Sequence, residues 1–116
     1  MSAHNFLHEF GKALASNPLR PTAAATLTAA DIAGGRHVEV SDGTGFTLTI
    51  PTPGAGFVNT VVVFSNTGAG ALVITDADGF GTGGSTSITV AQGQKAIVHY
   101  SELGACWTVL HHTAAA

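Results

Sequence analysis

The side chains best suited to metal chemistry are carboxylates and histidines in three short clusters. Asp76-Ala-Asp78-Gly79 has the opening rhythm of a calcium loop, in which alternating carboxylates face one ion. The remaining ligands and the closing glutamate of such a loop are missing, and Asp-X-Asp-Gly segments are more often simple turns. His4 and His8 lie one helical turn apart beside Glu9, without a third ligand. We expect no metal and no cofactor.

His111 and His112 stand near the C-terminal end of the sequence, where a polar tail is the default interpretation. A threefold axis could still gather copies of this pair around a metal. Cys106 precedes Trp107 on an expected strand, and no nearby cation would stabilise a thiolate, so the cysteine is expected to pack.

Covalent catalysis has no sequence cue in this chain. Its serines stand in no Gly-X-Ser-X-Gly elbow, and the glycines from Gly79 to Gly84 form no phosphate-binding motif. We therefore predict that the protein is not an enzyme. Trp107 and Tyr100 could each stack on a sugar, although core packing is more common for such residues.

Composition limits the partners. The net charge is -3, with only four Lys and Arg residues, so no basic face is available for nucleic acid. The longest strongly apolar run, Val61 to Phe64, is far below the roughly 20 residues of a membrane-spanning helix. No signal peptide is recognisable at the N-terminus, because charged and polar residues interrupt any apolar stretch. We expect synthesis in the cytoplasm, without nucleic-acid or membrane partners.

Charge is distributed unusually. Charged residues make up 9% of the chain, against about 25% in ordinary globular proteins. Between Asp42 and Lys95 only Asp76 and Asp78 are charged, and the stretch from Gly43 to Thr75 has no charge at all. Because interface cores are depleted in charge, this pattern indicates that much of the outer surface contacts protein.

Residues 1–25 should form a helix and an extended arm. An apolar stripe at helical spacing predicts a helix over Ser2 to Ser16, which Asn17-Pro18 would end. A helix of this length is marginal alone, so its stripe must dock on this domain, a sister subunit or a foreign surface. The predicted coat-binding or arm contacts are Phe6, Leu7, Phe10, Leu14, Pro18 and Pro21.

Residues 26–113 should form one all-β domain, because short alternating segments are separated by turn residues. About eight strands favour a jelly-roll-like β-sandwich. They are expected at Ala24 to Thr28, Arg36 to Val40, Phe46 to Ile50, Phe57 to Ser65, Leu72 to Asp76, Ser87 to Val90, Lys95 to Ser101 and Cys106 to His111.

The fourth expected strand is apolar on both faces, with Phe57, Val61 and Val63 opposed to Val58, Val62 and Phe64. A strand buried on both sides implies a second layer or a neighbouring subunit. The predicted oligomer or core contacts are therefore Phe57, Val61, Val62, Val63 and Phe64.

Several segments between Thr26 and Leu110 resemble small β-sandwich modules of tailed-bacteriophage structural proteins. They are Phe46-Thr-Leu-Thr-Ile-Pro51, Gly56-Phe57 with the valine-rich strand, Asn66-Thr-Gly, Leu72-Val-Ile-Thr-Asp-Ala-Asp-Gly79, Gln92-Gly-Gln94 and Trp107-Thr-Val. Such modules include capsid decoration (cement) proteins and domains of head and tail fibres.

The resemblance implies a homotrimer on the virion surface that binds the major capsid protein and stabilises the head shell. The alternative is a receptor- or glycan-binding module of a fibre, acting through Trp107 or the loop from Gly79 to Ser85.

Overall fold

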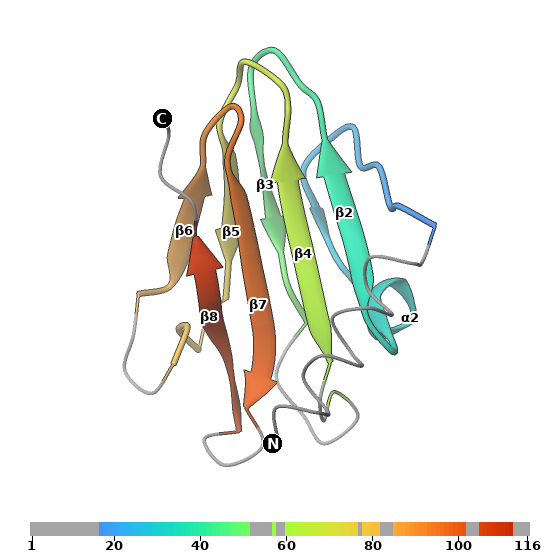
Figure 1. Cartoon of the computed structure of the whole chain (residues 1–116), viewed down its shortest axis with the longest axis vertical. Coiled ribbons are helices and arrows are strands. Elements are labelled where there is room, and N and C mark those ends of the chain that lie inside the picture. Colours follow the sequence, from blue (N-terminus) through green and yellow to red (C-terminus); the bar gives the residue numbers. More distant parts are fainter. Residues whose placement is uncertain are drawn as a thin grey trace.

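Two four-stranded sheets make up the described part of the protein, which is a computed structural model (Figure 1). The front sheet has the order β2 (Arg36–Val40), β4 (Val61–Asn66), β7 (Lys95–Ser101), β8 (Cys106–His112). The back sheet has the order β1 (Ala25–Thr26), β3 (Phe46–Thr49), β5 (Leu72–Thr75), β6 (Ser87–Val90). The structure describes residues 17–51, 57, 60–76, 78–81, 85–101 and 105–112.

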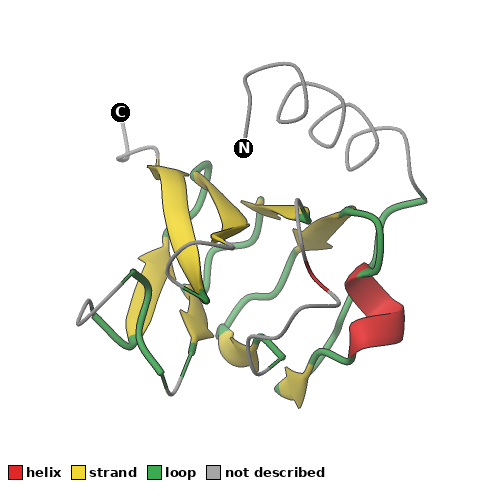
Figure 2. Ribbon diagram, turned by 90° about the horizontal axis from the view of Figure 1, so that it is seen from below, coloured by secondary structure: helices red, strands yellow, loops and turns green. Residues whose placement is uncertain are grey.

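The two sheets lie face to face as separate layers, the arrangement of a β-sandwich (Figure 2). The prediction of a mostly β fold is confirmed, with β4 beginning at Val61 rather than at Phe57. The predicted helix over Ser2 to Ser16 lies outside the described residues.

Strand direction does not confirm a jelly roll. The chain alternates between the sheets from β1 to β5, so β2 lies parallel to β4 while β3 lies parallel to both β1 and β5. Only the pairs made by β6, β7 and β8 are antiparallel in the described residues. A jelly roll is built from antiparallel Greek keys. The sequence pattern missed this difference because alternation reports which face is buried and not strand direction.

The chain passes through the two sheets in two stacked coils. Residues that pair between one coil and the next are separated by a constant number of residues in the sequence. Arg36 lies beside Val62 in the front sheet, and Phe46 lies beside Leu72 in the back sheet, so both pairs are 26 residues apart. The corner from Ser41 to Gly45 therefore stacks on the corner from Thr67 to Ala71. Two backbone hydrogen bonds join the corners, from Thr67 N to Val40 O at 2.9 Å and from Gly70 N to Asp42 O at 2.8 Å.

Glycine is required where the corners touch. A Cβ atom added to Gly68 would overlap the backbone of Asp42, and one added to Gly70 would overlap the backbone nitrogen of Gly45. Gly45 has φ +83°, and its own Cβ would overlap the carbonyl of Ala71. Rigid backbone atoms form these contacts, so no side-chain rotation can relieve the overlap.

One buried asparagine fixes the second corner to both sheets. Asn66 is 1% exposed, and its Nδ2 donates to Gly70 O at 2.9 Å and to Val90 O at 2.8 Å. Its Oδ1 accepts from Gly68 N at 3.0 Å. Because Val90 belongs to the back sheet and Asn66 ends β4, this side chain joins the two layers.

The core fills the space between the sheets and ends in an aromatic cluster. Phe57 packs against Trp107 with ring centroids 5.2 Å apart, and Tyr100 meets Trp107 edge-on at 5.7 Å. A short helix, α2 (Ala29–Ile32), closes one side of the core with the buried Ile32. Thr28 and Asp31 form a capping box at the start of α2, a pattern readable in the sequence that our strand assignment overlooked.

We predict that Gly70→Ala destabilises the fold by roughly 1–3 kcal/mol or more, because the new methyl group overlaps fixed backbone. Gly43→Ala is the matched control, since no atom lies within 4 Å of a Cβ at that position. Urea unfolding of both variants measures the difference. Equal stability of the two variants would show that the corners are not in contact.

Candidate functional site

The two outer faces of the sandwich are the candidate interaction surfaces, and the back face has no charge. Seven side chains alternate outward from the strands of the back sheet. One row across the four strands contains Thr26, Thr49, Thr75 and Ser87, and the next row contains Thr47, Val73 and Thr89. The Thr49 and Thr75 hydroxyl oxygens lie 3.0 Å apart. We call these seven residues the hydroxyl face.

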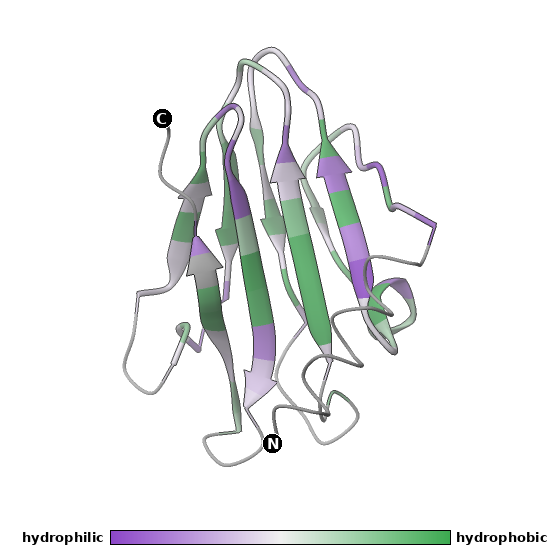
Figure 3. Ribbon diagram, viewed as in Figure 1, coloured by the Kyte–Doolittle hydropathy of each residue, from purple (hydrophilic) through white to green (hydrophobic). Residues whose placement is uncertain are grey.

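The front face combines an apolar centre with polar neighbours (Figure 3). Val61 and Val63 on β4 form a second apolar cluster with the partly buried Ile97 of β7, separate from the core. His37 on β2 lies beside Val63, and its Nε2 is 2.9 Å from the hydroxyl oxygen of Ser65. The face is therefore apolar along its middle strand and polar on β2.

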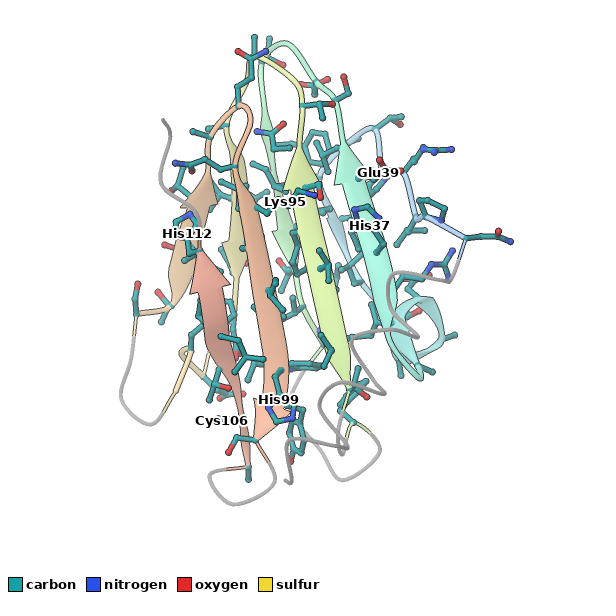
Figure 4. The ribbon with its side chains drawn as sticks, in the orientation of Figure 1. His37, Glu39, Lys95, His99, Cys106 and His112 are labelled. Carbon is teal, nitrogen blue, oxygen red and sulfur yellow. The ribbon has the colours of Figure 1, made fainter. Side chains whose placement is uncertain are left out.

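Charged and titratable groups lie at the ends of this front face (Figure 4). Glu39, Ser65 and Lys95 share one row, while His99 lies further along β7 beside Val61. His99 is 9% exposed, and burial lowers its pKa, followed by the positive charge of the amino terminus. Both effects favour the neutral form of the His99 side chain.

A shallow groove of about 280 Å³ separates the arm from the end of β2. It is lined by Arg20–Thr22, Glu39–Ser41 and Thr67. Arg20 Nη2 lies 3.1 Å from Glu39 Oε1, with exposed fractions of 70% and 35% for the two side chains. An exposed ion pair of this kind contributes about 0–1 kcal/mol to stability, so it holds the arm against β2 only weakly.

The predicted site residues separate into several environments. Phe57, Val62 and Phe64 belong to the core between the sheets, whereas Val61 and Val63 face outward from the front sheet. Phe57 was predicted on the same side as Val61, and that assignment is wrong because Phe57 precedes β4 and packs with the aromatic cluster. Val58, Phe6, Leu7, Phe10 and Leu14 lie outside the described residues.

The arm is partly built into the front sheet. Pro18 and Pro21 are half-buried on either side of Leu19 and Arg20. Leu19 forms a parallel bridge with Val38, in which Leu19 N donates to His37 O and Glu39 N donates to Leu19 O, each at 2.9 Å. The arm therefore extends the edge of the front sheet beyond β2.

The aromatic residues considered for sugar stacking are both buried. Trp107 is 0% exposed, and its Nε1 donates to Pro51 O at 2.9 Å. Tyr100 is 4% exposed in the same cluster. A ring buried on this scale presents no face to a sugar.

Asp76 is the one buried carboxylate of the calcium-like segment. It is 2% exposed, its Oδ1 accepts from Asp78 N at 3.1 Å, and its Oδ2 has no hydrogen-bond partner among the described residues. Burial raises the pKa of Asp76, and the neighbouring Asp78 carboxylate adds to that increase. Protonation would remove the buried negative charge. Among the described residues, no three His, Cys, Asp or Glu side chains gather in a way that could hold a metal ion.

Cys106 and His112 mark the two ends of β8. Cys106 is buried, and His112 is exposed at the end of the strand. Cys106 therefore packs as expected, while β8 continues one residue beyond its predicted end.

Sequence reasoning missed the hydroxyl face as a unit. Its signal was present, because Thr47, Thr49, Thr75 and Thr89 each alternate with an apolar residue. Only the register of three neighbouring strand pairs turns this local alternation into one surface.

The sequence matches no protein-family model, and no curated protein is significantly similar to it. None of the helices in the described ranges is long and apolar enough to cross a membrane.

We predict that Asp76→Asn gains stability relative to the natural chain as pH rises above about 4. The unfolded chain releases the Asp76 proton near pKa 3.8, whereas the folded chain holds it to higher pH, so rising pH favours unfolding of the natural chain. Asparagine has no proton to release. Free energies of unfolding in urea between pH 4 and 7 measure the effect.

Asp42→Asn is the control of opposite sign. The Thr44 hydroxyl, followed by the amides of Gly45 and Thr44, lowers the pKa of Asp42. Its contribution is complete above the ordinary pKa of 3.8 and is lost as pH falls below that value. This variant should therefore lose stability relative to the natural chain as pH rises toward 3.8, so its urea profile extends below pH 4. Parallel pH profiles for the Asp76→Asn variant and the natural chain would contradict the assignment of Asp76.

Proposed function

We propose that this chain is a structural virion protein, a capsid decoration (cement) protein. It forms a homotrimer, binds subunits of the major capsid protein and stabilises the head shell. It is made in the host cytoplasm and acts on the capsid surface, without enzymatic activity.

The observation that carries this proposal is the hydroxyl face. An ordinary exposed sheet face carries charges, and like-charge repulsion and hydration then oppose association. Here seven outward positions on four adjacent strands are Thr, Ser or Val. Loss of charge is the compositional mark of an interface core. This face is the proposed contact between copies of the chain.

The proposed coat contact is the N-terminal part of the chain. From Thr22 to Ala25 every residue is exposed and uncharged, along the edge of the sandwich. Pro18 and Pro21 restrict the backbone on either side of the Leu19 bridge. An arm held at one edge can reach a neighbouring coat subunit while the hydroxyl face contacts a sister chain.

The described polar groups support a structural role. Asp42 accepts hydrogen bonds from its own corner, Asn66 joins the two layers, and Thr28 caps α2. These side chains complete the fold and do not converge on a common point. A glycan-binding fibre module is less well supported, because Trp107 and Tyr100 are both buried.

We predict that Val73→Glu dissociates the oligomer while the chain stays folded. Val73 lies at the centre of its row, between Thr47 and Thr89, so the substitution would bury an unpaired charge in each contact between copies. Light scattering after gel filtration should give the mass of one chain. Gln92→Glu introduces the same charge at an exposed position on the β6–β7 turn. This variant should keep the oligomer mass of the natural chain. Retention of the oligomer by the Val73→Glu variant would exclude the hydroxyl face as the contact.

If the protein decorates capsids, adding it should restore the stability of capsids that lack it. Adding the purified protein to capsids that lack it should give saturable binding and raise the temperature at which the capsids break. The monomeric Val73→Glu variant should bind more weakly, because three linked attachment points give a higher effective concentration than one. Saturation without a rise in capsid stability, or no binding, would contradict the proposal.

A further inference from the structure

A ring of three identical chains needs two complementary surfaces on every chain. Each contact around a threefold axis is heterologous, which means that one patch of a chain meets a different patch of the next. In the proposed homotrimer the hydroxyl face is one of these patches. The second patch must be exposed, free of charge and on another side of the same sandwich.

The hydroxyl face consists of short side chains. Its seven residues are threonine, serine and a single valine, Val73, which lies between Thr47 and Thr89. Three such faces turned inward around an axis would leave the centre unfilled, whereas interface cores pack as densely as protein interiors. A flat face of short side chains instead fits apolar side chains that project from a neighbouring surface.

Projecting apolar side chains occur on β8, at the free edge of the front sheet (Figure 1). Val109 is 37% exposed and Leu110 is 46% exposed, and they are the exposed large apolar residues of the described part of the chain. From Cys106 to Leu110 the strand has no charged residue. Edge strands of chains that stay apart are usually protected by charge, and this one lacks that protection.

A β-bulge produces the exposed pair. Ile97 pairs with His111 and Val98 pairs with Val109, so Leu110 is the extra residue of β8. A bulge interrupts the alternation of side chains and re-aims them. Two consecutive apolar side chains are thereby exposed together, where a regular strand would turn one of them toward the opposite face.

The described loop before β6 covers only the first part of this edge. Gly81 N donates to Trp107 O at 2.7 Å, so the backbone at Gly81 lies beside Trp107. Trp107 is 0% exposed, whereas Val109, two residues further along, is exposed. The open part of the edge therefore begins where the contact with Gly81 ends.

We propose that Val109 and Leu110 of one chain pack against the hydroxyl face of the next chain around the threefold axis. The occupant of the β8 edge is thus a second copy of this chain, and this assignment rests on the proposed function. The hydroxyl face points outward from the back sheet, whereas β8 is the edge strand of the front sheet. Every chain can therefore present each surface to a different neighbour. Neither surface carries a charge, so the contact buries no unpaired ion.

Two variants that each remove one surface test this arrangement in the full chain. Leu110→Glu removes the apolar projection and keeps the hydroxyl face, whereas Val73→Glu does the reverse. Each variant alone should give the mass of one chain in native mass spectrometry. An equal mixture should give a species of two chains, one of each variant, because one intact contact remains and the ring cannot close. The exposed control Gln92→Glu should form the same oligomer as the natural chain.

The possible failures are distinguishable. A trimer that survives Leu110→Glu would overturn this arrangement and leave the proposed function standing. An equal mixture without the two-chain species, at the highest concentration at which each variant is a single chain, would also overturn it. A natural chain that is single at every concentration would contradict the homotrimer and this contact together.

Leu110→Ser covers the case in which Leu110→Glu fails to fold. Serine removes the apolar side chain without adding a charge. The concentration at which half of the trimer dissociates should rise roughly tenfold or more, because each contact loses a buried leucine. Gln92→Ser is the matched control and should leave that concentration unchanged. The same midpoint for Leu110→Ser and the natural chain would overturn the arrangement.

Discussion

The close stacking of two chain corners is the constraint on which the rest of this structure depends. Gly68 and Gly70 allow the second corner to lie directly on the backbone of the first, and this contact sets the 26-residue repeat. With the corners in contact, β2 and β4 pair in one layer while β3 and β5 pair in the other. Asn66 then ties the stacked corners to the end of β6. A Cβ atom at either glycine would overlap this backbone, so the two corners would have to move apart.

That register produces two outer faces with different properties. On the back sheet, parallel pairing aligns hydroxyl side chains into rows without charge, which suits burial against another chain. On the front sheet, the same coil places Val61 and Val63 on one face of β4, next to Ile97 of β7. We propose that a sister chain meets the first face. This proposal follows from the scarcity of charge on the back sheet.

The sequence predicted which residues are buried better than it predicted how the strands connect. The alternation at Phe46, Leu48 and Ile50 correctly located β3, because burial of one face controls side-chain pattern. Strand direction depends on contacts between corners far apart in the chain, and no local pattern encodes it. The apolar run before Ser65 was assigned one strand, whereas Phe57 leaves the sheet to join Trp107. The hydroxyl face was hidden for the same reason, since it exists only across strands.

The central functional claim is that a nearly uncharged sandwich works as part of a symmetric assembly. Native mass spectrometry of the full chain, over a range of concentrations, tests it most directly. The proposed role predicts one dominant species of three chains, each of 11.6 kDa. A single chain at every concentration would contradict the claim, because the hydroxyl face would then be an exposed surface without a sister chain.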